Sequence, residues 1–174
     1  MLVLLLLFLA CPVVAADMNQ SSRSRGGAVQ TLYSVVNSTF SPAIAGELDL
    51  YKYMLPANTM SAEGDTLFVR CESTTSSVSS LKNLSVRFAG SLLASSEVTT
   101  TNSDWTITAM IRYRSSALMR THGARQMDGT VGNTHLVTAW DPTIANEIRC
   151  IALGGGVAAD VEGGGMLVQF RPAP

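Results

Sequence analysis

The sequence predicts an all-β protein, an antiparallel β-sandwich of jelly-roll type with about eight strands. Apolar side chains recur at every second position over much of residues 48–171, which is the period of a strand that buries one face. Clusters of Gly, Pro, Asn and Asp interrupt this alternation at short intervals, and no long window has a helical period. Short alternating strands joined by turns are typical of a sandwich or a jelly roll.

Length and composition predict one soluble domain with a real core. The chain has 174 residues, of which 47% are apolar and 14% are charged. The formal net charge is -1 and no run of basic residues occurs, so the sequence offers no electrostatic surface for nucleic acid. Low charge and many Ser and Thr residues suit outward strand faces that are shielded by association with other chains.

The amino-terminal segment, residues 1–16, has two interpretations. It contains no charge, and its apolar run at residues 2–9 is shorter than the roughly 20 residues that span a bilayer, so no stable membrane span is expected. The segment is either a signal peptide cleaved before Asp17, or an upstream extension of the reading frame ahead of Met18. Residues 17–30 are polar and aperiodic, as in a flexible arm, and residues 31–174 form the predicted jelly-roll domain.

The strands follow from the alternation in chain order. A short first strand at 31–36 ends before Ser41-Pro42, and the Ser/Thr cluster at 73–80 and the Ala89-Gly90-Ser91 segment are expected to be a loop and a turn. The clearest core strand is 105–113, where Trp, Ile, Ala, Ile and Tyr share one face. The other predicted strands are 48–54, 67–71, 84–88, a strand that begins at 92, and 117–120, 135–140, 147–153 and 166–171.

Three cysteines have different predicted fates. Cys11 leaves with a signal peptide, whereas Cys71 and Cys150 each lie in an apolar strand pattern. In an oxidising compartment these two are able to pair, but packing as buried free thiols is the favoured expectation.

Two glycine triplets and two histidines are the first candidates for a ligand site. The triplets at 154–156 and 163–165 lack the Lys-Ser/Thr pair of a phosphate loop, so they are predicted to be flexible turns. His122 and His135 have no Cys or carboxylate at metal-binding spacing and are expected to be solvent-facing strand residues. No metal ligand and no cofactor-binding residue is therefore predicted.

No catalytic residue is predicted either, and the protein is not expected to be an enzyme. A Gly-x-Ser-x-Gly turn is absent from the sequence. Glycoside hydrolysis needs two facing carboxylates, but the available acidic residues are more simply explained as unrelated loop side chains. These residues are Glu97, Asp104, Asp128, Asp141, Asp160 and Glu162.

Aromatic residues in strand patterns are expected to fill the core or a subunit interface before they contact sugar rings. They are Trp105, Trp140, Tyr51, Tyr53 and Tyr113. Loop residues at the ends of the sandwich are the better candidates for recognition, because a rigid sandwich presents its loops together.

The order of several turns resembles a known family. The segment 48–65, with Pro-Ala-Asn-Thr and Gly-Asp turns, resembles the opening of jelly-roll modules in bacteriophage tail fibres, tail spikes and related virion proteins. The similarity continues at 86–90, at Ser103-Asp104-Trp105 and at 166–170, and covers roughly residues 31–174. The apolar start at residues 1–16 departs from this family, whose members assemble in the host cytoplasm without export.

The resemblance implies a non-enzymatic virion part. Such a module is usually a homotrimer that contacts other virion proteins and presents loops to a host-surface glycan or protein, and its expected location is the virion. It supplies no catalytic residues. The alternative, favoured by the signal-like start, is an exported bacterial adhesin or carbohydrate-binding β-sandwich.

Overall fold

The computed structural model describes most of the predicted domain. It covers residues 28–36, 39–40, 47–75, 81–98, 102–115, 118–127, 130–138, 140–153 and 160–174, with the backbone alone described at 39–40, 97–98, 118–127 and 130–138. Residues 1–27 lie outside this description, so the signal peptide or upstream extension and most of the polar arm stay predictions. In the ranges given, no helix has the length and apolar character needed to cross a bilayer.

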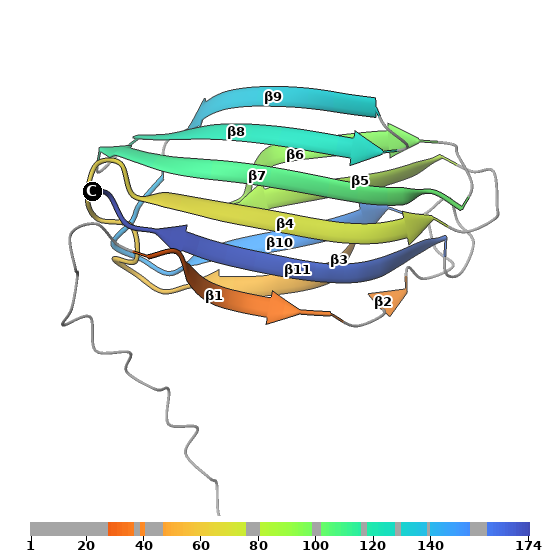
Figure 1. Ribbon diagram of the computed structural model, residues 1–174, viewed down its shortest axis with the longest axis horizontal. Coiled ribbons are helices and arrows are strands. Elements are labelled where there is room, and N and C mark those ends of the chain that lie inside the picture. The colour runs from red at the N-terminus through yellow and green to blue at the C-terminus, as the bar shows by residue number, and fades with distance from the viewer. Residues whose placement is uncertain are drawn as a thin grey trace, which may run out of the picture.

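Two antiparallel sheets pack face to face, with the larger sheet in front of the smaller one in Figure 1. The larger sheet contains β1 (Gln30–Val35), β2 (Thr39–Phe40), β4 (Thr66–Thr75), β7 (Asp104–Ser115), β8 (Leu118–Met127), β9 (Thr130–Thr138) and β11 (Val161–Arg171). The smaller sheet contains β3 (Glu47–Leu55), β5 (Lys82–Phe88), β6 (Ser91–Val98) and β10 (Asn146–Leu153).

The strand order is that of a jelly roll, which confirms the predicted fold class. The larger sheet runs β1-β11-β4-β7-β8-β9 and the smaller one β3-β10-β5-β6, so early and late strands alternate within each sheet. The eight strands β1, β3, β4, β5, β6, β7, β10 and β11 make this framework. The β8–β9 hairpin extends the larger sheet beyond this framework; its strands overlap the predicted ones at 117–120 and 135–140 but have different bounds, and β2 adds a short pairing with β11.

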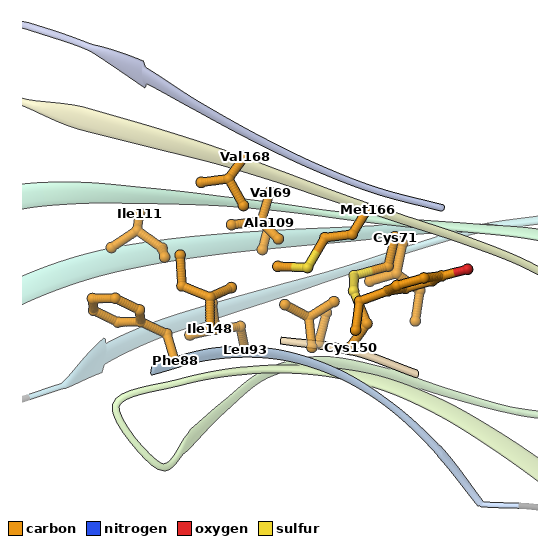
Figure 2. Close-up of a cluster of buried hydrophobic side chains, with 14 of the residues drawn as sticks. Val69, Cys71, Phe88, Leu93, Ala109, Ile111, Ile148, Cys150, Met166 and Val168 are labelled. Carbon is orange, nitrogen blue, oxygen red and sulfur yellow. A yellow bond between two sulfur atoms is a disulfide. The ribbon is translucent and has the colours of Figure 1, made fainter. Parts of the chain in front are cut away.

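The alternation of apolar and polar residues correctly predicted which side chains face the core. In β7 the predicted inward set is buried, and the residues between them are half-buried or exposed. Figure 2 shows how inward side chains from both sheets meet, with Val69 and Val168 of the larger sheet above Phe88 and Ile148 of the smaller one. The predicted turn between β5 and β6 is also present, because Ala89 and Gly90 both have positive φ angles, as a tight two-residue hairpin requires.

Cys71 and Cys150 form a disulfide, so the expectation of free thiols was wrong. Cys71 points inward from β4 and Cys150 inward from β10, and their Cα atoms are 6.1 Å apart (Figure 2). That separation lies within the range that a disulfide bridges. The bond therefore joins the two sheets through the middle of the sandwich.

The Ser/Thr cluster begins inside a strand, which corrects the prediction that residues 73–80 are one loop. Ser73 and Thr75 take inward positions of β4 and are buried. The Thr75 N–H donates to the Ser103 carbonyl oxygen at 2.9 Å, and the Ser103 N–H donates to Thr75 Oγ1 at 2.9 Å. These bonds satisfy buried polar groups that the sequence pattern alone suggested would face water. Residues 76–80 lie outside the described residues.

The second glycine triplet is also part of a strand, which corrects its interpretation as a flexible turn. Residues 163–165 lie in β11, where the register with β4 shifts between Gly163 and Gly165. A Cβ at Gly163 would lie 2.6 Å from the hydroxyl oxygen of buried Tyr51, and one at Gly165 would lie 2.7 Å from the Val35 carbonyl oxygen. These glycines allow close packing against the opposite sheet and against β1. The first triplet lies outside the described residues.

Gly163→Ala is therefore expected to lower the free energy of unfolding by about 1–3 kcal/mol, because the added methyl group overlaps the Tyr51 ring. Urea unfolding followed by tryptophan fluorescence measures the change. Gly164→Ala is the matched control, since its Cβ would meet nothing closer than 3.4 Å. Equal destabilisation by both variants would show that loss of glycine itself, and not contact with Tyr51, is responsible.

Candidate functional site

The aromatic residues noted in the sequence are mainly core residues, as expected. Trp105, Tyr51, Tyr113 and Trp140 are buried. Trp140 packs against Phe88 and Tyr113, with ring centroids 5.3 and 6.0 Å away. None of these four rings is available to stack on a ligand.

Tyr53 is the half-buried member of the set. It stacks on Tyr33 of β1 with ring centroids 5.2 Å apart, at the side of the sandwich where edge strands β1 and β3 face each other. Burial raises the pKa of the Tyr53 hydroxyl above its usual value. The pair closes that side of the core and leaves little aromatic surface free.

The outer face of the larger sheet carries the aromatic residue that the sequence analysis passed over. Phe68 lies in β4 between two inward core residues and has 45% of its surface exposed. In register it is flanked by Gln169 of β11 and Met110 of β7. A signal for it existed, because Phe68 is a large apolar residue at an outward position of an alternating strand.

Hydrogen-bonding side chains continue this face along β4. Arg70 and Glu72 take the next two outward positions after Phe68 and form an ion pair with each other. Thr108 of β7 lies opposite Arg70 and is half-buried. Because outward residues repeat about every 7 Å along a strand, Phe68, Arg70 and Glu72 span about 13 Å. We call Phe68, Arg70, Glu72 and their cross-strand neighbours the outer-face site.

A shallow hollow lies at one end of this site. Its volume is about 200 Å³, and it is lined by Ser34, Val35, Val36, Arg70, Glu72, Gly165, Met166 and Leu167. It forms where β11 has glycine in place of a side chain, between the walls that β1 and β4 provide. The hollow is smaller than the roughly 300–1,000 Å³ of pockets for drug-sized ligands, so it suits one small polar ring. Ser34, Arg70 and Glu72 supply a hydroxyl, donors and acceptors there.

The outer face of the smaller sheet has its charges paired internally. Lys52 binds Glu147 at 2.8 Å and Arg87 binds Glu47 at 2.6 Å, while Arg149 pairs with Asp49. The hydrogen bond to Asp49 is the main reason that the pKa of Arg149 is raised. Such mutual pairing occupies donors and acceptors of these groups. Among the described residues, the smaller sheet also has no exposed aromatic ring comparable to Phe68.

One of these ion pairs also covers an apolar residue. Glu47 is in β3 and Arg87 in β5, with β10 between them, so their contact passes over β10. Ile151 of β10 lies between core residues that point the other way, yet only 1% of its surface is exposed. The long side chains of the ion network therefore shield it from water.

The turns at one end of the sandwich are held by local hydrogen bonds. Asp65 accepts bonds from the N–H groups of Ser61, Ala62 and Ala173 at 2.8–2.9 Å. Hydrogen bonds from the hydroxyl and then the N–H of Thr143 lower the pKa of the exposed Asp141 carboxyl. Most loops of the opposite end lie outside the described residues, so recognition by those loops stays a prediction.

The structure brings the two histidines into register, and it also places Glu162 of β11 and Asp104 of β7 on either side of Thr74 in β4. His122 on β8 lies directly opposite His135 on β9, although their side chains are outside the description. Asp104 accepts a hydrogen bond from Thr74 at 3.0 Å, Asp141 contacts Thr143, and Asp160 pairs with Lys82. Within the described ranges, no group of three or more His, Cys, Asp or Glu side chains is arranged to hold a metal ion. Asp128 lies outside those ranges, and Glu97 has only its backbone described.

Comparison with known proteins gave structural similarity only. No protein-family model and no curated protein matches this chain. The structure is similar to the C-terminal domain of EclA, a sugar-binding protein, with 10% sequence identity and a TM-score of 0.42 over 77% of this chain and 78% of that one. It is also similar to the CBM2 module of the evolved Dit of Lactobacillus casei BL23 phage J-1, with 8% identity and a TM-score of 0.40 over 86% and 82% of the two chains. The function proposed below therefore rests on the surface of this chain.

Proposed function

We propose that this chain is a non-enzymatic recognition module that binds a cell-surface glycan at the outer-face site. The observation that carries the proposal is Phe68, an aromatic ring exposed in the middle of a sheet face, with Gln169 beside it on β11, Met110 beside it on β7 and Arg70 at the next outward position of β4. An aromatic ring packs on the apolar C–H face of a sugar, while Arg, Glu, Gln and Thr side chains bind its hydroxyl groups. Rigid strands hold all these groups in place.

The shape of the site suits a short oligosaccharide. The Phe68 ring provides an apolar surface on which one sugar ring packs. Further along β4, the hollow beside Arg70 and Glu72 provides hydrogen-bonding groups for the next sugar. Asp104, Asp141 and Asp160 have separate partners, which supports binding without hydrolysis by these three residues, because a glycosidase needs two carboxyl groups across one glycosidic bond.

Phe68→Ala is expected to weaken glycan binding by roughly 5- to 30-fold, equivalent to about 1–2 kcal/mol for one lost aromatic contact. A glycan array identifies the ligand, and isothermal titration calorimetry then measures Kd for the wild type and the variant. Phe68→Tyr, which retains the ring, is expected to keep most of the affinity. Leu81→Ala removes another exposed apolar side chain away from this face and serves as the control.

Two results would count against this proposal. If the chain binds no glycan on an array of bacterial and host surface structures, glycans are excluded as its ligand class. Full affinity in Phe68→Ala, with the variant folded, would move the binding site elsewhere on the molecule.

The first proposed setting is a bacteriophage virion, in which the chain is a tail fibre or tail spike component that forms a homotrimer with other virion proteins around it. The ordered turn similarities over residues 31–174 support this setting. Exposed Met54, Leu92 and Ile144 supply apolar contact area away from the outer-face site. Light scattering is expected to give the mass of three chains, and a monomer at micromolar concentration would contradict the trimer.

The second proposed setting is an exported bacterial adhesin or carbohydrate-binding module. The Cys71–Cys150 disulfide favours it, because disulfides persist in oxidising compartments and are rare in the cytosol. Mass spectrometry of the chain from its native source separates the two settings. A mature chain that begins at Asp17 supports export, whereas a chain that retains the apolar start or begins at Met18 supports assembly in the cytoplasm.

A further inference from the structure

A row of arginines crosses the outer face of the larger sheet next to Phe68. In register, Thr66 of β4 lies between Arg171 of β11 and Arg112 of β7. The backbone of Arg120 on β8 continues the row opposite Arg112. Neighbouring strands are about 4.8 Å apart, so the backbones of Arg171 and Arg112 are separated by about 10 Å. We call Arg112 and Arg171 the arginine row.

The described carboxylates do not neutralise the arginine row. Arg112 and Arg171 are both exposed, and neither takes part in an ion pair with another described residue. The nearby acids have other partners, because Glu63 pairs with Arg114 and buried Asp65 accepts bonds from backbone N–H groups. Two like charges therefore share one small area, which attracts an anion.

The arginine row and Phe68 are adjacent parts of one surface. Phe68, Met110 and Gln169 form the next outward row, two residues along each strand from Thr66, Arg112 and Arg171. Outward rows are about 7 Å apart, which is the width of one small ring. A sugar ring on Phe68 would thus lie one outward row from the backbones of both arginines, a distance that a long arginine side chain spans. In the structure Arg112 Nη2 lies beside the Gly64 turn, so the Arg112 side chain would turn toward Phe68 on binding.

We propose that the arginine row binds the negatively charged group of an acidic sugar residue, so that the glycan recognised here is anionic. This inference rests on the glycan-binding function proposed above and specifies its substrate class. A guanidinium presents paired N–H donors that match the two oxygens of a carboxylate. The surface is too small for nucleic acid, which needs an extended series of cations along its backbone.

The test uses a matched pair of ligands, an oligosaccharide that contains a uronic acid and the same oligosaccharide with the carboxyl group reduced to an alcohol. Calorimetry at low and at high salt is expected to give at least about tenfold tighter binding of the acidic ligand at low salt, with a difference that shrinks as salt rises. Arg112→Gln and Arg171→Gln are each expected to weaken binding of the acidic ligand by about three- to tenfold and to leave binding of the neutral ligand unchanged.

The controls separate this inference from the function beneath it. Lys52→Gln removes one exposed positive charge from the other sheet and is expected to change neither affinity. Phe68→Ala is expected to weaken the binding of the acidic and the neutral ligand to the same extent. The acidic specificity would be overturned, and glycan binding left intact, by either of two results. One is equal affinity of the wild type for the two ligands, and the other is an equal loss of affinity for both ligands in the arginine variants. Binding of neither ligand, together with a negative array, would overturn both proposals.

Discussion

Loss of the Cys71–Cys150 disulfide is expected to lower the free energy of unfolding by about 3–5 kcal/mol. The bond joins residues 79 positions apart, so it removes a large loop-closure entropy from the unfolded chain. It also fixes β4 of one sheet to β10 of the other at a fully buried point of the core. The double variant Cys71→Ala/Cys150→Ala, compared with the wild type in urea unfolding, measures the sum of the lost cross-link and the lost sulfur packing.

Reduction of the wild type separates these two contributions. Treatment with a reductant breaks the cross-link but keeps both sulfur atoms in the core, whereas the alanine variant also loses their contacts. The reduced wild type is expected to lie between the oxidised protein and the double variant. If the oxidised and reduced proteins unfold at the same urea concentration, the disulfide contributes nothing to stability and this prediction is wrong.

The disulfide illustrates what alternation predicts and what it leaves open. A period of two assigns each residue to a face, and on that basis both Cys71 and Cys150 were placed correctly in the interior. Alternation does not say which residue of the opposite sheet lies across the core, because that depends on how the sheets stack. The sequence therefore left only two guides to the state of the thiols, the redox compartment and the tendency of buried Cys to pack as a small hydrophobic residue. The resulting expectation of free thiols was wrong.

The same limit explains the candidate site. Local composition predicts the succession of strands and turns along the chain and the core strand β7, since turn residues and alternation are local properties. It does not predict the order of strands within each sheet. The outer-face site depends on register across β11, β4 and β7, which brings Gln169 and Met110 to either side of Phe68. Glycines 163–165 were misinterpreted for a related reason, because composition cannot distinguish a turn from a strand that must pack closely against Tyr51.

A buried ion pair is the other feature with a large expected effect. Lys82 begins β5 at an inward position and Asp160 directly precedes β11, and the side chains of both are 0% exposed. The Lys82 Nζ atom lies 3.9 Å from Asp160 Oδ1. Taking two charges out of water costs several kcal/mol each, and their attraction and hydrogen bonds offset this cost only while both are present.

Lys82→Met is therefore expected to lower the free energy of unfolding by about 3–5 kcal/mol, because Asp160 would then be a buried charge without its cation. Asp160→Leu should cost a similar amount for the converse reason. The double variant Lys82→Met/Asp160→Leu removes both charges and is expected to be far more stable than either single variant, since an apolar pair of similar size has no desolvation cost. Urea unfolding of all four proteins gives the coupling energy directly. Additive losses would mean that the two charges do not stabilise each other, and that the apposition of β5 and β11 at this end of the sandwich depends on packing alone.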